Sequence, residues 1–464
     1  MSRYSLSGRH GPTVTASTAG GQSAMAASPV VRLLNWRAIW AFLRKQPASY
    51  WLVCAYVFIE YVRPQQIYPV IEGLPFGMAT IGLCGIAYIM EGAPLRKLNV
   101  ADVLLGVYTA IVLISSITAF SPSFAFANLE VYISWIVVYA LISNIVTTEK
   151  RFFVFMIAYI LYSLKMSQHG FRSWAGNGFG FSSWGVTCAP AWFHNSGECG
   201  IQMSMFLPIS LFFALAFWPY LGRLGKAFWG FVPVTAVGTV VASSSRGALL
   251  AIGAVGAWLV LRSRHRVRAG IVAVVLGIVV FMVTPAEQKA RLSAMGDDGT
   301  SVSRLVYWKH AREIIKDHPL LGIGYANWFP YYRTYYNPRG ELVHNVFYQA
   351  ATELGFPGLF AFFGMIGATF YLNRKTRRIA RRMGSQGRFL SHMATGLDGA
   401  LVGFMVSGFF VTVLYYPFFW INLAMTSALY TSAISAARAQ ASTALAGETG
   451  DPRNGTIAPL NQYA

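Results

Sequence analysis

Hydrophobic runs separated by short polar stretches recur along almost the whole chain. We expect these runs to form α-helices that cross a membrane, because a helix of about 20 residues spans a bilayer core and pairs its own backbone groups there. One run is short, and Pro357 can break another. The pattern predicts an all-α integral membrane protein of about twelve transmembrane helices, near residues 50–62, 74–90, 100–120, 130–147, 152–166, 199–218, 227–243, 247–261, 269–284, 343–372, 394–414 and 417–436.

Composition and charge support a membrane protein. Hydrophobic residues make up 55% of the 464 residues and charged residues 12%, whereas about 25% of an average soluble domain is charged. When the N-terminus is placed in the cytoplasm, most of the 37 Lys and Arg residues fall on the cytoplasmic side, as the positive-inside rule requires. We therefore expect both termini in the cytoplasm and contact with membrane lipids. Nucleic acid is excluded as a partner, because no soluble domain gathers the basic residues.

These expectations divide the chain into five parts. Residues 1–48 and 438–464 are expected to be cytoplasmic tails, the first of them disordered because it is rich in Ser, Gly, Thr and Ala. Residues 49–284 hold spans one to nine, with an outer loop at 167–198, and residues 343–437 hold spans ten to twelve. Between them, residues 285–342 are expected to form a periplasmic helical cap. Cys188 and Cys199 fall on the outer side and could form a disulfide in an oxidising compartment, although we favour free thiols.

Arg246 is a charged residue in the turn between two hydrophobic runs, in "ASSSRGALLA". An arginine costs about 2.5–3.5 kcal/mol at the centre of a bilayer on insertion scales. Arg246 could simply extend to the outer interface without a specific role. We favour a functional role, because it lies on the outer side, where it does not help to set topology, and follows three serines that could line a polar cavity.

The segment "SRLVYWKHAREIIKDHP" predicts an amphipathic helix. Steps of four place Arg304, Trp308 and Arg312 on one face, and Lys309, Arg312 and Lys316 form a neighbouring basic stripe. The stripe could touch lipid phosphates from a helix that lies on the membrane, or it could hold a lipid-linked pyrophosphate. For the stripe as a whole we favour lipid contact.

The stretch "ELVHNVFYQAATELGFPG" places polar groups at the start of a hydrophobic run. A helix that begins at about Leu342 would bring Glu341, His344 and Tyr348 onto one face. A carboxylate beside an imidazole favours its protonated form and can orient it as a general base. Glu341 could equally complement the helix dipole, with His344 as an interfacial histidine, so the spacing alone leaves both interpretations open.

Together, "SSSRGALLA", "SRLVYWKHAREIIKDHPLLGIGYANW" and "HNVFYQAATELGFPGLFAFF" resemble the O-antigen ligase family of bacterial inner membranes. The resemblance covers roughly residues 195–415, and the three motifs have the order and spacing of that family. The earlier segment "NSGECGIQMSMFLPI" resembles the family's asparagine-containing segment before a span, which adds Asn195 and Glu198 to the candidate residues.

The resemblance implies a glycosyltransferase that moves a glycan from undecaprenyl pyrophosphate to the sugar of lipid A–core at the periplasmic face. It implies that Arg246 and Arg304 bind the pyrophosphate and that His344 activates the acceptor hydroxyl. Arginines can replace the divalent metal of many sugar transferases, so no metal or other cofactor is expected. The supporting candidates are Glu341, Asn345, Tyr348, Lys309, Arg312, Arg172, Asn195 and Glu198.

Other functions remain open at this stage. An O-antigen polymerase or a protein O-oligosaccharyltransferase would share the donor chemistry, and only the acceptor site would separate them. A flippase or transporter for lipid-linked sugars would be expected to show internal repeats and broken helices, and the sequence shows no clear repeat. A structural membrane protein is the interpretation that we favour least.

Overall fold

The computed structural model describes residues 28–180, 185–293 and 299–448. Within these ranges the ordered elements are all helical and none is a β-strand, so the predicted all-α fold is confirmed. Each predicted hydrophobic run falls on a helix. These helices are α2 (Ala48–Val62), α3 (Phe76–Met90), α4 (Val100–Ile117), α5 (Pro122–Ile145), α6 (Glu149–Gly176), α7 (Ser196–Phe217), α8 (Arg223–Ala242), α9 (Arg246–Arg262), α10 (Arg266–Val283), α14 (Val346–Arg382), α15 (Arg388–Gly408) and α16 (Pro417–Glu448).

Seven helical segments of the described chain are long and apolar enough to cross a membrane. They contain α4, α5, α7, α8, α10, α14 and α15. The chain is thus a multi-pass membrane protein, and the number of twelve spans stays a prediction. The remaining helices are η1 (Pro29–Leu34), α1 (Trp36–Leu43), η2 (Pro64–Gln66), η3 (Pro69–Ile71), η4 (Ala191–Phe193), η5 (Trp218–Tyr220), α11 (Ala286–Ser293), α12 (Gly299–Asp317), α13 (Trp328–Tyr335) and η6 (Gly384–Gly387).

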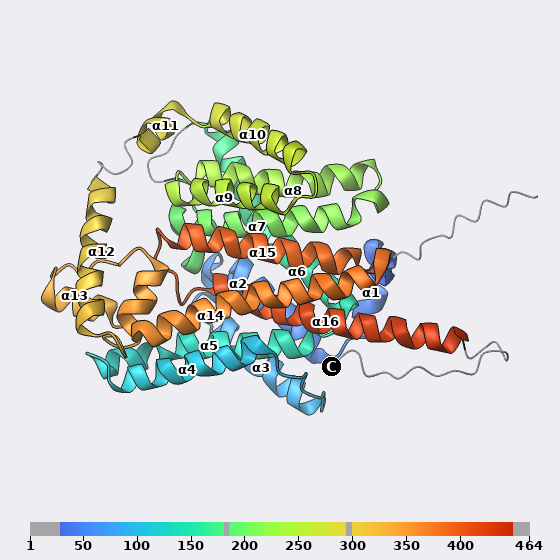
Figure 1. Cartoon of the computed structure of the whole chain (residues 1–464), viewed down its shortest axis with the longest axis horizontal. Coiled ribbons are helices and arrows are strands. Elements are labelled where there is room, and N and C mark those ends of the chain that lie inside the picture. Colours follow the sequence, from blue (N-terminus) through green and yellow to red (C-terminus); the bar gives the residue numbers. More distant parts are fainter. Residues whose placement is uncertain (1–27, 181–184, 294–298, 449–464) are drawn as a thin grey trace, which may run out of the picture.

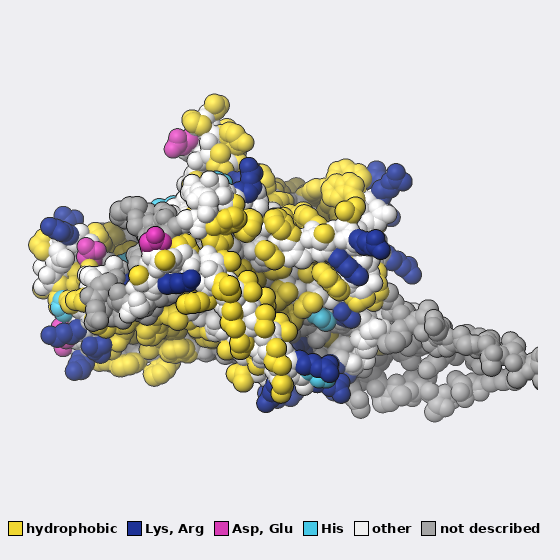
Figure 2. All heavy atoms as spheres, turned by 90° about the horizontal axis from the view of Figure 1, so that it is seen from above, with side chains coloured by type: hydrophobic (Ala, Val, Ile, Leu, Met, Phe, Trp, Pro, Cys, Tyr) yellow, Lys and Arg dark blue, Asp and Glu magenta, His cyan; other side chains and the backbone are white. Residues whose placement is uncertain are grey.

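The long helices run side by side along the length of the molecule, which gives it two distinct ends (Figure 1). Helix α12 crosses one end of the bundle, with α13 beside it, whereas α1 and the end of α16 lie at the other. Hydrophobic side chains cover much of the middle, and Lys and Arg gather mainly toward the two ends (Figure 2). Within the segment 285–342, α12 and α13 therefore cover one end of the bundle, while the periplasmic location of this end stays a prediction.

Two expectations about the ends of the chain are wrong in part. Residues 29–43, expected to belong to a disordered tail, form η1 and α1. Val30 and Leu33 are buried, and the Ser28 hydroxyl donates a hydrogen bond of 2.8 Å to Glu149 at the start of α6. Burial of these apolar side chains explains why the segment is ordered. At the other end α16 continues to Glu448, beyond the expected boundary at 437. Residues 1–27 and 449–464 of the expected tails lie outside the described residues.

The structure joins Cys188 and Cys199 in a disulfide, with 5.3 Å between their Cα atoms. Our preference for free thiols was therefore wrong. Cys199 lies in the first turn of α7, and Cys188 lies in the loop that leads to it, so the bridge closes a short loop at the start of α7. Two cysteines so near in sequence can meet without any change in the packing of the helices.

Glycines explain how the segment 319–324 fits against α14. The N–H groups of Ile323 and Gly324 donate hydrogen bonds to the C=O groups of Thr352 and Glu353, at 2.8 and 3.1 Å. Gly322 has a φ of +63°, and a Cβ atom there would lie only 2.4 Å from the backbone of Glu353. Only glycine permits this close approach of two backbones. The motif "GIG" is therefore a structural element that fixes the segment after α12 on α14.

The predicted break in the run 343–372 is confirmed. Gly355 has a φ of +66° and interrupts α14, two residues before Pro357. The N–H of Phe356 leaves the helix pattern and donates to the C=O of Pro319 at 2.8 Å. Because proline offers no N–H and crowds the preceding turn, the chain kinks here and binds the segment after α12.

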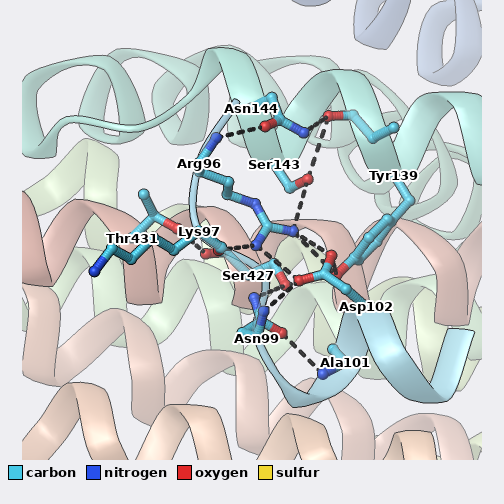
Figure 3. Close-up of polar contacts among 11 residues, drawn as sticks. Arg96, Lys97, Asn99, Ala101, Asp102, Tyr139, Ser143, Asn144, Ser427 and Thr431 are labelled. Atoms are coloured by element: carbon cyan, nitrogen blue, oxygen red, sulfur yellow. Dashed lines mark hydrogen bonds and ion pairs between the residues drawn. The ribbon is translucent and has the colours of Figure 1, made fainter. Parts of the chain in front are cut away.

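A buried ion pair ties the start of α4 to α5 and α16 (Figure 3). The Arg96 guanidinium donates to both oxygens of Asp102, at 2.9 and 2.5 Å. The Tyr139 hydroxyl of α5 donates to Asp102 at 2.9 Å and lies 2.8 Å from the hydroxyl of Ser427 on α16. The side chain of Arg96 is only 5% exposed. Water therefore cannot take the place of either partner, and each charge depends on the other.

Substitution of Arg96 by alanine should destabilise this end of the bundle. Asp102 would stay buried without its cation, and loss of one partner of a buried pair costs about 3–5 kcal/mol. We expect a clear drop in the unfolding temperature of the purified protein in detergent. The exposed neighbour Lys97, replaced by alanine, is the matched control, and equal unfolding temperatures for the two variants would contradict the assigned role.

Candidate functional site

His344 lies in the extended link between α13 and α14. Its backbone has a φ of +49°, which an L-residue adopts rarely but histidine more readily than most. Its N–H donates a hydrogen bond of 2.7 Å to the hydroxyl of Thr412. The next residue, Asn345, accepts from the N–H groups of Phe347 and Tyr348 at 2.9 and 3.0 Å and so caps α14. The conformation of His344 is thus fixed from both sides.

This local structure contradicts the expected face of Glu341, His344 and Tyr348. We placed the start of the helix at about Leu342, whereas α14 begins at Val346. The Asn345 cap and the left-handed conformation of His344 together prevent an earlier start. Glu341 lies in the link instead, where its C=O accepts a hydrogen bond of 2.7 Å from the Trp328 indole.

Helix α12 packs on this link through one face, as its spacing predicts. The Trp308 indole donates to the C=O of Val343 at 3.1 Å. One turn further on, Arg312 donates to the Tyr348 hydroxyl at 3.3 Å. One turn earlier, Arg304 lies close enough for its charge to act on the His344 imidazole. Lys309, the neighbour of Trp308 on this helix, is exposed.

Burial of the imidazole and the positive charge of Arg304 lower the pKa of His344 to about 4. This direction is the opposite of the one expected from a neighbouring carboxylate, because burial disfavours the charged ring and because Arg304, not Glu341, is the charge that acts on it. At neutral pH the imidazole is therefore uncharged. An uncharged imidazole can accept a proton, whereas an imidazolium cannot.

The turn between α15 and α16, residues 409–416, joins the link to the start of α9. Thr412 of this turn accepts the hydrogen bond from His344. Two residues earlier, the Phe410 ring packs against Gly247, where a Cβ atom would lie 3.0 Å away. Arg246 is the first residue of α9, immediately before Gly247, and is half-buried. The α15–α16 turn therefore brings the Arg246 turn and the His344 link to one region.

Asn195 and Glu198 have a structural role at the same turn. Asn195 accepts from the Glu198 N–H at 2.9 Å, and the Glu198 carboxylate accepts in return from the Asn195 N–H at 3.4 Å. This reciprocal pair caps α7. The Tyr416 hydroxyl donates to Glu198, so the cap also fixes the α15–α16 turn against α7.

Arg172 lies near the end of α6, where its neighbour Trp174 packs with Val241 and Ala242 at the end of α8, just before the turn that carries Arg246. The sequence analysis missed Thr412 and Tyr307, whose ring centroid lies 6.2 Å from that of His344. Thr412 carried one signal, because it is a polar residue inside the apolar stretch "SGFFVTVLYYPFFW".

A cavity of about 690 Å³ lies at the far end of α14, well away from His344. It lies between the start of α6, the end of α14 and the second half of α16, and its lining includes Glu149, Met383 and Gln440. None of the expected site residues lines this cavity.

Replacement of Arg304 by glutamine should raise the pKa of His344 from about 4 toward its ordinary value of 6.5. The reason is that removal of a nearby positive charge favours the protonated imidazole. The measurement is a pH titration of the His344 nitrogen resonances in detergent micelles. Lys309→Gln, which removes an exposed charge from the same helix, should leave the pKa unchanged. A pKa in Arg304→Gln that stays at or below that of the unmodified protein would contradict the placement of Arg304.

Comparison with known proteins identifies the segment that carries these residues. Residues 231–363 match the family described as O-Antigen ligase, a range that includes Arg246, Arg304 and His344. No curated protein matches the chain. The matched range includes α12, α13, the link and the first part of α14, which together hold the neutral imidazole and its neighbouring arginine. Residues 231–363 are therefore similar to the O-antigen ligase family, in agreement with the resemblance that the three sequence motifs carry.

Proposed function

We propose that the protein is an O-antigen ligase that transfers a glycan from undecaprenyl pyrophosphate to lipid A–core at the periplasmic face of the inner membrane. The observation that carries the proposal is the uncharged imidazole of His344 beside the guanidinium of Arg304, within the segment that matches the family. An uncharged base and a fixed cation are the two groups that this transfer requires.

In this mechanism His344 accepts the proton of the acceptor hydroxyl. The hydroxyl oxygen attacks the anomeric carbon of the donor from the face opposite the leaving group. The bond between that carbon and the pyrophosphate oxygen breaks, and its electron pair leaves with the pyrophosphate. One displacement of this kind inverts the anomeric centre and forms no covalent intermediate with the enzyme.

Arg304 and Arg246 bind the pyrophosphate. A guanidinium stays charged and can offer two parallel hydrogen bonds to phosphate oxygens. It thereby stabilises the negative charge that grows on the leaving group. The half-buried position of Arg246 at the start of α9 suits this role, since a partly dry environment strengthens the attraction.

Arg304 also couples donor binding to the strength of the base. In the structure its positive charge helps to hold the pKa of His344 at about 4, which makes the imidazole a weak base. A bound pyrophosphate would offset that charge, and the pKa of His344 would rise toward its ordinary value. The imidazole then becomes a better proton acceptor only when a donor is present.

His344→Ala should lower the rate of transfer by about 10²- to 10⁴-fold, which is the usual effect of losing a general base. The assay uses purified protein in detergent, undecaprenyl-pyrophosphate-linked glycan and lipid A–core, with EDTA present. We expect unmodified protein to form product under these conditions. His392→Ala is the matched control, because this histidine lies on α15 and bonds to the Arg388 carbonyl, at the far end of the bundle.

The product identifies the acceptor class. Longer lipid-linked glycan, or glycan found only on protein, would contradict ligation to lipid A–core and assign a sister activity. Transfer by His344→Ala at the rate of unmodified protein would contradict the role of the imidazole. No product from unmodified protein would contradict the proposal as a whole.

A further inference from the structure

A chain of aromatic contacts leads from His344 to the surface of α13. The Tyr307 ring lies 6.2 Å from the His344 ring and 5.8 Å from Tyr332, between ring centroids. Tyr332 in turn stacks on Tyr336 at 5.3 Å. These contacts connect the candidate site to α13 without a break.

Two residues of α13 and one residue of the α4–α5 turn form a second aromatic group, which we call the aromatic platform: Tyr331, Tyr335 and Phe120. Their ring centroids lie 4.7 to 5.6 Å apart. Tyr335 is 61% exposed and Phe120 41% exposed. Tyr335 of α13 and Phe120 of the α4–α5 turn are exposed aromatic rings in mutual contact, and they present a surface that suits a ligand with an apolar face.

Polar groups border the platform. The carboxylate of Asp317 acts on the Tyr331 hydroxyl, and the His318 ring lies 5.9 Å from the Tyr331 ring. Both Asp317 and His318 are exposed. The surface thus combines flat apolar ring faces with hydroxyl, carboxylate and imidazole groups that can form hydrogen bonds.

The platform is held rigidly, although it is built from two separate segments. The Phe120 N–H donates to the C=O of Ile323 at 2.8 Å. The next N–H, of Ser121, donates to the side chain of Asn327 at 2.7 Å. These bonds fix the α4–α5 turn to the residues just before α13. A surface fixed before binding loses little entropy when the ligand arrives.

We infer that the aromatic platform binds sugar units of the glycan, at a distance from the unit that reacts at His344. This inference rests on the proposed function. A sugar ring has an apolar C–H face that can lie on an aromatic ring, and a rim of hydroxyls that can bond to Asp317, His318 and the tyrosine hydroxyls. The aromatic path through Tyr307 reaches Tyr332 and Tyr336 of α13, the helix that also carries Tyr331 and Tyr335 of the platform.

A membrane surface is the less suitable occupant. Anionic lipid headgroups attract basic residues, whereas one of the groups that border Tyr331 is the carboxylate of Asp317, which would repel them. In addition, α13 and the α4–α5 turn lie together at the extreme end of the molecule, beyond the main length of the bundle (Figure 1). An extended glycan that grows away from the membrane would pass this end.

Donors of different length test the inference. Tyr335→Ala should raise the KM for a donor that carries many repeat units by about three- to tenfold, the effect expected of one aromatic contact. The KM for a donor with a single repeat unit should stay unchanged, as should kcat for both. Tyr335→Phe keeps the ring and should retain the KM of unmodified protein. Phe120→Ala is a second variant, on the other segment of the platform.

A direct binding measurement separates this inference from the proposed function. Lipid-free glycan, released from the donor, is titrated into unmodified protein and into Tyr335→Ala by calorimetry, and we expect weaker binding by the variant. If unmodified protein binds glycan but forms no product, glycan binding by the platform is supported and the ligase proposal is contradicted. An equal change of KM for long and short donors, or equal glycan binding by both proteins, would overturn the inference, and the former would assign the surface to contact with the membrane.

Discussion

The candidate site depends on the backbone contact between the segment 319–324 and α14. Two hydrogen bonds from Ile323 and Gly324 and the absence of a side chain at Gly322 bring the two backbones together. This contact holds the segment after α12 against the kink at Gly355, and α12 consequently packs on the link that carries His344. The site is therefore assembled by parts of the chain that contain no reacting group.

The hydrophobic pattern of the sequence was sufficient to locate the long helices, because apolar runs that must pair their own backbone in a membrane have one stable conformation. The spacing of Arg304, Trp308 and Arg312 likewise predicted one face of α12, and Trp308 contacts the link that carries His344 while Arg312 contacts the first turn of α14. Both predictions rely on the local periodicity of apolar and polar residues, which can be read directly from the sequence.

The predictions that were wrong concern features that local periodicity does not determine. The helix after His344 begins later than its apolar pattern suggests, because the side chain of Asn345 and the conformation of His344 decide the start. The hydrogen bond from His344 to Thr412 joins residues 68 positions apart, so no local sequence pattern predicts it. The lowered pKa of His344 arises from burial and from Arg304 on α12. The nearby Glu341 predicted a raised pKa, which is the wrong direction.

Helix α4 is anchored at both ends, by the Arg96–Asp102 pair at its start and by the bonds of Ser115 and Phe120 to the segment before α13. Its 18 residues span about 27 Å at the usual rise per residue. The length of the helix sets the distance between the two anchored ends. One inserted residue would shift one anchor by about 1.5 Å and turn it by about 100° relative to the other. The length of α4 is therefore under a stricter constraint than its apolar composition, and natural variation should substitute residues here far more readily than add or remove them.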